Sequence, residues 1–183
     1  MVREITSEYI AGKIDVWGHC TWCVAAPFSG KTTLAKHIAE RTHSHYISLD
    51  DLMRERGLDL SQLQPVEEWE KTHHQCIQLL HEFMKQGINV VLDDTLFLKW
   101  LRDRYRNAAL EHQYQVETVY LAIPLAELEK RRQQVLATRE RNYLVDESFY
   151  PVIEQFEVPD SAENTVVFDL NCELSNWLNM HFS

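Results

Sequence analysis

The residues best suited to chemistry in this sequence form a short loop near its start. A small residue, Ala25, is followed after four residues by Gly30-Lys31-Thr32-Thr33, the spacing of a Walker A motif. Glycine accepts the backbone angle that turns successive N–H groups toward an anion, and lysine and threonine can hold phosphate oxygens and a divalent cation. Ala25 replaces the usual first glycine, which alanine tolerates where φ is negative. The residues predicted to surround nucleotide phosphates are Ala26, Pro27, Phe28, Ser29, Gly30, Lys31, Thr32 and Thr33.

Two pairs of aspartates each follow an apolar run. Asp50 and Asp51 follow the first run, and Asp93 and Asp94 follow the second. Ligands of open parallel sheets bind beyond the carboxyl ends of the strands. A carboxylate of the first pair could therefore take the proton of an attacking hydroxyl, and one of the second pair could hold Mg²⁺ together with Thr32. The alternative interpretation of both pairs is capping of the helix that follows.

The elements that must position these groups alternate along the chain. Strands are predicted at Thr21–Ala26, Tyr46–Leu49, Asn89–Leu92, Val116–Ala122 and Thr165–Asp169, which are short and rich in apolar residues. Helices are predicted at Lys31–Arg41, Pro65–Lys85, Phe97–Glu111 and Leu125–Leu136. Alternating strands and helices indicate an α/β fold, a three-layer sandwich with a five-stranded, mainly parallel sheet.

The order of the motifs narrows the class of protein. The guanine-reading Asn-Lys-x-Asp motif of GTPases and the Ser-Gly-Gly signature of transporter ATPases are both absent from the sequence. The ordered set of motifs resembles that of the small P-loop kinases, which include the polynucleotide 5′-kinase domain, the zeta-toxin sugar-nucleotide kinases and chloramphenicol phosphotransferase. The resemblance runs from about Cys20 to Asp169, through the blocks APFSGKTT, ISLDDLMRE, VVLDDT, VYLAIP with ELEKRR, and FEVP. It implies a nucleotide-kinase-like fold with a lid, ATP as the phosphoryl donor, and Mg²⁺.

The resemblance also implies roles for the first acidic pair. Asp50 matches the family's catalytic aspartate, and an arginine that grips the acceptor is expected three residues later. Met53 stands at that position, whereas Arg54 follows Asp51 by three residues. Asp50 is the favoured base, but this shift of one residue leaves Asp51 open as the alternative.

The second acidic pair and the helix after it carry further implied contacts. Asp94 and Thr95 match the Asp-Thr pair of the polynucleotide-kinase group, so Asp94 is a candidate acceptor contact. The metal ligand stays open between Asp93 and Asp94. Arg102 is a candidate acceptor contact as well, and a solvated helix face explains it equally well.

A lid is implied at residues 131–147, where arginines cluster in a stretch without an apolar pattern. Arg131 matches the arginine at which the lid starts and is expected to contact the nucleotide. Arg139 and Arg141 are expected to stabilise the transferring phosphoryl group, because guanidinium binds phosphate oxygens two at a time. The alternative is a solvated, charged helix end.

Composition limits the remaining possibilities. The 183 residues suit a single domain with an N-terminal extension at residues 1–19, and no run of 18 apolar residues predicts a membrane span. Without a secretory signal, the expected location is the cytoplasm. The net charge of −10 disfavours long nucleic acid, so a nucleoside, a sugar or an antibiotic is the expected acceptor. The alternatives are a polynucleotide 5′-hydroxyl kinase and a non-catalytic ATP-binding regulatory or toxin–antitoxin partner.

Overall fold

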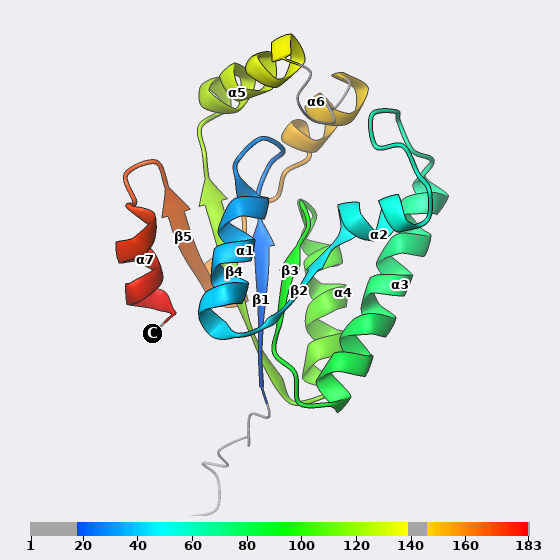
Figure 1. The fold of residues 1–183 in the computed structure, drawn as a ribbon, viewed down its shortest axis with the longest axis vertical. Helices are drawn as coiled ribbons and strands as arrows, with labels where there is room; N and C mark the ends of the chain where they lie inside the picture. The colour runs from blue at the N-terminus through cyan, green and yellow to red at the C-terminus, as the bar shows by residue number, and fades with distance from the viewer. Residues whose placement is uncertain (1–17, 139–145, 183) are drawn as a thin grey trace, which may run out of the picture.

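The computed structural model describes residues 18–138 and 146–182, which form a five-stranded sheet between two layers of helices (Figure 1). The strands are β1 (Gly18–Val24), β2 (His45–Ser48), β3 (Val90–Asp93), β4 (Tyr114–Ala122) and β5 (Thr165–Asp169). They lie in the order β2-β3-β1-β4-β5, and every pairing is parallel. The predicted α/β sandwich with a parallel sheet is confirmed.

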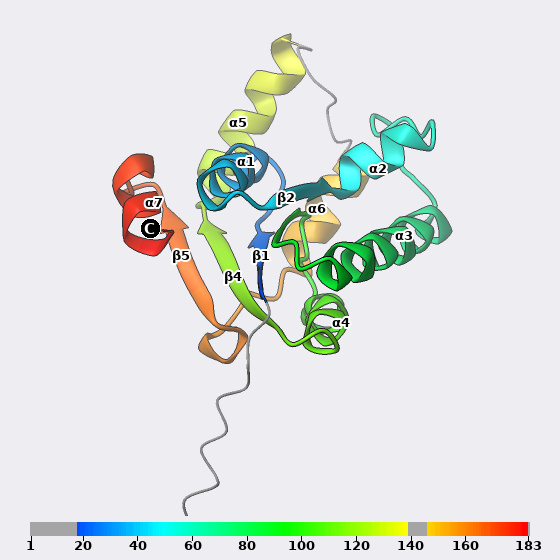
Figure 2. The ribbon, with the colours of Figure 1, turned by 60° about the horizontal axis from the view of Figure 1, so that its bottom comes forward.

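Helices connect the strands and cover both faces of the sheet (Figure 2). They are α1 (Lys31–Thr42), α2 (Leu49–Glu55), α3 (Val66–Lys85), α4 (Lys99–Leu110), α5 (Leu125–Thr138), α6 (Asp146–Glu154), the 3₁₀ helix η1 (Ser161–Glu163) and α7 (Leu174–His181). The four predicted helices are present with ends shifted by at most two residues, whereas α6 and α7 were not predicted. None of the helices in the described ranges is long and apolar enough to cross a membrane.

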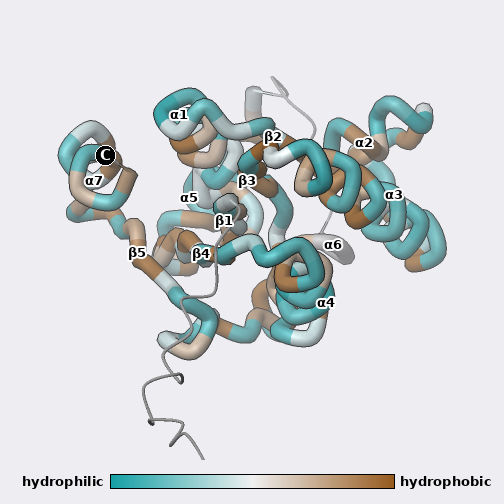
Figure 3. Tube along the Cα trace, turned by 90° about the horizontal axis from the view of Figure 1, so that it is seen from below, coloured by the Kyte–Doolittle hydropathy of each residue, from teal (hydrophilic) through white to brown (hydrophobic). Residues whose placement is uncertain are grey.

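Two apolar clusters hold the layers together, one on each face of the sheet. Trp22 packs with residues of α3 and α4, including Leu80 and Tyr105, whereas Cys23 packs with residues of α1 and α7, including Ile38 and Trp177. In the view from below, hydrophobic and hydrophilic residues alternate along these helices (Figure 3). The sheet is thus covered on both faces, which explains why its strands lack a clean alternation of polar and apolar residues.

The central strand begins earlier than predicted. β1 starts at Gly18, so the last two residues of the expected extension 1–19 belong to the sheet, and residues 1–17 lie outside the described part. A Cβ atom on Gly18 would lie only 2.4 Å from the ring of Tyr114. The Tyr114 hydroxyl donates to the carbonyl of Ile88 at 3.1 Å, which fixes the ring in that place. Glycine is therefore required where the central strand enters the sheet.

The first acidic pair lies on a helix and not at the end of a strand. β2 ends at Ser48, and α2 begins at Leu49, the residue that was predicted to end the strand. The Ser48 hydroxyl caps the helix by accepting from the Asp51 amide at 3.3 Å. Ser48 therefore takes the capping role considered for Asp50 and Asp51, which occupy the first turn, where their charge complements the helix dipole.

Candidate active site

The loop between β1 and α1 lies at the carboxyl edge of the sheet, below α5 and α6 in Figure 1. Its backbone is left-handed at Gly30, with φ of 94°, as the motif requires, and also at Phe28, with φ of 67°. The Ser29 hydroxyl accepts from the Lys31 amide at 3.3 Å, and α1 begins directly behind the loop. The ring of Phe28 packs on Phe149 of α6, with centroids 5.7 Å apart, a contact that the sequence did not predict. The loop thus presents a helix N-terminus to an anion.

Asp93, the last residue of β3, is the acid that contacts this loop. Lys31 Nζ contacts Asp93 Oδ1, and the Tyr46 hydroxyl donates to Asp93 Oδ2 at 2.6 Å. Burial alone would raise the pKa of Asp93, but Lys31, Tyr46 and the Thr32 hydroxyl together lower it. Burial would likewise lower the pKa of Lys31, yet the carboxylates around it, Asp93 first, raise it. Thr32 and Asp93 offer neighbouring oxygen donors, which is the chemistry that Mg²⁺ takes.

Asp94 and Asp50 complete a group of carboxylates around Lys31. Asp94 is buried, with 8% of its surface exposed, and both acids contribute to the raised pKa of Lys31. Partial desolvation raises the pKa of Asp50, and so do Asp94 and Asp93, while Lys31 and Arg54 act in the opposite direction. The Asp50 side chain nevertheless keeps 59% of its surface exposed, so this carboxylate is accessible to an incoming molecule.

Arg54 distinguishes the two residues of the first acidic pair. Its Nη1 lies 2.7 Å from Asp51 Oδ1, whereas its Nη2 lies 3.9 Å from Asp50 Oδ2. Asp51 is therefore held by Arg54, whereas Asp50 lies within the electrostatic influence of Lys31, which lowers its pKa against the larger effect of desolvation. The charge of Lys31 on α1 thus acts on Asp50 of α2.

Arg131 reaches back from α5 to the phosphate loop. Its Nη1 donates to the carbonyl of Ser29 at 2.8 Å and to that of Phe28 at 3.4 Å, while its Nε donates to Glu127 at 2.8 Å. The described parts of the expected lid segment 131–147 are the end of α5 and the start of α6. Arg139 and Arg141 lie outside the described residues.

Arg132, next to Arg131 in α5, has a buried position that the sequence did not predict. It is buried, and its guanidinium carbon lies 5.2 Å from the centroid of the Phe149 ring and 5.7 Å from that of Tyr150. Cation–π contacts of this kind join α5 to α6. Because Phe149 also packs on Phe28, the two helices and the loop form one connected group.

A cavity of about 320 Å³ opens beside the loop, at the carboxyl ends of β4 and β5. Ser29, Gly30 and Thr33 line one side of it. The rest is lined by Arg131, Asp169 and Cys172 and by the apolar side chains of Leu34, Leu121, Ile123, Phe168, Leu170 and Leu174. Its volume lies at the lower end of the range for ligand pockets, about 300–1,000 Å³. The sequence did not reveal this cavity, because its walls come from segments that only the fold brings together.

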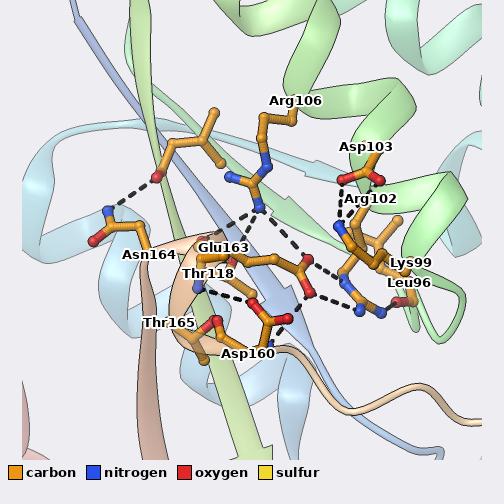
Figure 4. Close-up of polar contacts among 12 residues, drawn as sticks. Leu96, Lys99, Arg102, Asp103, Arg106, Thr118, Asp160, Glu163, Asn164 and Thr165 are labelled. Atoms are coloured by element: carbon orange, nitrogen blue, oxygen red, sulfur yellow. Dashed lines mark hydrogen bonds and ion pairs between the residues drawn. The ribbon is translucent and has the colours of Figure 1, made fainter.

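Arg102 does not join the site, which corrects both interpretations of this residue. Its side chain is fully buried, and its Nε and Nη2 donate to the two carboxylate oxygens of Glu163 at 2.6 and 2.9 Å (Figure 4). Its Nη1 donates to the carbonyl of Leu96 at 2.9 Å. Arg106 adds a contact to the same carboxylate at 3.6 Å. With its donors engaged in the core, Arg102 is neither at an acceptor site nor on a solvated helix face.

Comparison with known proteins identifies the family. The sequence matches the AAA domain model over residues 22–159. The chain belongs to the AAA domain family. The matched residues of this AAA domain include the loop, both acidic pairs and α5. A search of curated proteins finds no match.

Solved structures share the fold at low sequence identity. A sugar kinase from Janibacter superposes with a TM-score of 0.70 and 15% identity, covering 89% of this chain and 91% of that chain. The APS kinase of Mycobacterium tuberculosis in complex with AMPPNP and APS gives 0.67 and 15%, covering 89% and 94%. Kti12 of Chaetomium thermophilum in complex with ADP-AlF3 gives 0.67 and 14%, covering 90% and 99%. This AAA domain therefore has the fold of small P-loop kinases, as the sequence predicted.

Proposed function

We propose that this AAA domain transfers the γ-phosphoryl group of Mg-ATP to a hydroxyl of a small-molecule acceptor. The observation that carries the proposal is the contact of Lys31 with Asp93 beside the phosphate loop, with Asp94 and Asp50 near enough to raise the pKa of Lys31 as well. A site that only bound an anion would be weakened by three carboxylates, because they repel phosphate. A phosphotransferase needs them, to hold a metal ion and to receive a proton.

The nucleotide side of the site is the loop with the cavity beside it. Lys31 and the N–H groups of the loop would bind the β- and γ-phosphates, and the apolar cavity suits a flat base. Thr32 and Asp93 would hold Mg²⁺, which when bound neutralises charge on the phosphates. Arg131 already contacts the loop backbone and would face the nucleotide from α5.

The acceptor side is formed by α2 and the end of β3. Asp50 would take the proton of the attacking hydroxyl, and its raised pKa makes it a stronger base than an ordinary aspartate. Asp94 would orient the acceptor, and Arg54 would bind it after release from Asp51. Arg139 and Arg141 remain proposed contacts to the transferring phosphoryl group.

The charge around α2 and α3 favours a small acceptor over a polynucleotide. A polynucleotide kinase needs free cationic side chains beside its base, because affinity for nucleic acid comes from neutralised phosphates. Here Arg56 contacts Glu68, and Arg104 binds the carboxylate of Glu70 at 2.8 Å. Both of these basic side chains are therefore paired with acids. A cytoplasmic location, as expected from the sequence, would suit such an enzyme.

A second candidate is a nucleotide-binding partner that performs no transfer. The observation in its favour is that Arg54, the expected acceptor-binding arginine, is occupied by Asp51 at 2.7 Å. If this ion pair is permanent, the loop binds ATP but the acceptor lacks its cation. Phosphate transfer distinguishes the two candidates directly.

The test is a screen with radiolabelled ATP against nucleosides, sugars, antibiotics and 5′-hydroxyl oligonucleotides. Wild-type protein should label one of the small molecules, whereas Lys31→Ala should label none because it loses the phosphate contact. Binding of ATP without labelling of any acceptor would support the non-catalytic partner. Labelling of the oligonucleotides alone would establish the polynucleotide alternative.

A further inference from the structure

The sequence did not predict the hydrogen bond from Tyr46 to Asp93. Tyr46 lies on β2, the edge strand that pairs with β3, and its hydroxyl donates to Asp93 Oδ2 at 2.6 Å. Lys36 of α1 stacks over the Tyr46 ring, with its Nζ 5.5 Å from the centroid. Lys36 thus contacts the ring, while the hydroxyl is bound to Asp93, the carboxylate that contacts the phosphate-loop lysine.

The other groups that hold Asp93 are those that nucleotide binding would draw away. Lys31 contacts Oδ1, and the Thr32 hydroxyl helps to lower the pKa of Asp93. In the proposed function both side chains turn to the phosphates and the metal ion. Tyr46 comes from a different strand and has no role toward the phosphates. It is therefore the contact that can stay with Asp93 throughout.

We infer that Tyr46 is a positioning residue that keeps Asp93 oriented toward the metal ion after Lys31 and Thr32 have turned to the nucleotide. The inference rests on the proposed function. Asp93 is only 3% exposed, so bulk water has little access to Oδ2 as a replacement donor. Without that donor the carboxylate would be free to rotate away from the orientation that the metal ion requires.

The test is calorimetric titration with AMPPNP, in Mg²⁺ and in EDTA, of the wild-type protein and of Tyr46→Phe. The substitution removes one oxygen and keeps the ring. A hydrogen bond to a charged group is worth roughly a factor of ten or more in an equilibrium constant, so the gain in affinity that Mg²⁺ gives should fall about tenfold. The affinity in EDTA should stay the same, because Lys31 and the loop are unchanged.

Tyr114→Phe is the matched control. It also removes a buried tyrosine hydroxyl, one that donates to the carbonyl of Ile88 at the opposite end of the sheet. It should leave the gain from Mg²⁺ unchanged. If Tyr46→Phe keeps the full gain, or weakens binding equally in Mg²⁺ and EDTA, Tyr46 is only structural and the inference is wrong. If the wild-type protein binds no AMPPNP in Mg²⁺, the proposed function fails, and this inference with it.

Discussion

The two aspartate pairs look alike in the sequence and occupy opposite environments in the structure. Asp93 and Asp94 end an interior strand and are 3% and 8% exposed. Asp50 and Asp51 lie on the first turn of α2, which follows the edge strand β2. Their side chains are 59% and 54% exposed. The strand position, and not the local sequence, therefore decides whether such a pair is fixed in the core or open to an incoming molecule.

The same comparison supports the two different roles proposed for Asp93 and Asp50. The pKa of Asp93 is lowered because Lys31 and Tyr46 outweigh its burial, so it stays ionised and suits a metal ion. The pKa of Asp50 is raised because partial desolvation and the neighbouring carboxylates outweigh Lys31 and Arg54. In the proposed function, the lowered pKa suits Asp93 to hold a metal ion, and the raised pKa suits Asp50 to accept a proton.

The largest expected effect is on catalysis at the exposed pair. Asp50→Asn should lower kcat by about 10²–10⁴-fold, the contribution of a general base, with little change in the KM for ATP. Asp51→Asn is the matched control and should cost less than about tenfold, because its carboxylate is held by Arg54. Steady-state kinetics with the acceptor found in the screen measures both. The reverse ranking would make Asp51 the base.

The next effect is on stability at the buried pair. Asp93→Asn leaves Lys31 without its main partner. Removing one member of a buried ion pair costs about 3–5 kcal/mol, here nearer the lower value because the charges of Asp94 and Asp50 also stabilise protonated Lys31. Because the folded-state pKa of Asp93 is lowered, its contribution is present at neutral pH and is lost as the pH falls below the ordinary aspartate pKa of about 3.9. Urea unfolding at pH 7 and at pH 3 measures the difference. An equal cost at both pH values would contradict this assignment.

A smaller effect of opposite sign is expected for Asp50. Its raised pKa means that ionised Asp50 destabilises the folded protein above the ordinary aspartate pKa, so Asp50→Asn should stabilise it at pH 7. The gain should be below about 1 kcal/mol because the side chain is largely exposed. It should vanish near pH 3, where both forms are uncharged. If Asp50→Asn instead destabilised the protein at pH 7, the predicted opposite effects of the Asp50 and Asp93 carboxylates on stability would be wrong.

The smallest effect is a shift in the pH dependence of kcat. Arg54 lowers the pKa of Asp50, although desolvation and the neighbouring carboxylates have the larger, opposite effect. Arg54→Gln should therefore move the acidic limb of the kcat profile to higher pH, whereas Arg54→Lys, which keeps the charge, should move it less. An unchanged limb in Arg54→Gln would show that Asp50 is not the group that titrates.

Much of the fold and part of the site could be predicted from the sequence. The spacing of Gly30-Lys31-Thr32, the five apolar runs and the four longer helices are local patterns, and their order along the chain implies parallel crossovers. Predictions from local patterns were wrong where a side chain made a contact that the pattern did not indicate. The strand β2 ends at Ser48, one residue earlier than predicted, because the Ser48 hydroxyl caps α2. Arg102 lies in the core because it pairs with Glu163, which is 61 residues away in the sequence.

The sequence by itself determined the phosphate loop, because a left-handed glycine, a lysine and a helix start are fixed by neighbouring residues and need no distant partner. The tertiary structure alone decided what surrounds that loop. Tyr46 reached Asp93, Phe149 covered Phe28, and the cavity beside Thr33 closed only when β4, β5 and α7 came together. Burial and ion pairing depend on the full set of neighbours in space, so charge and accessibility at each aspartate could not be predicted from residue order.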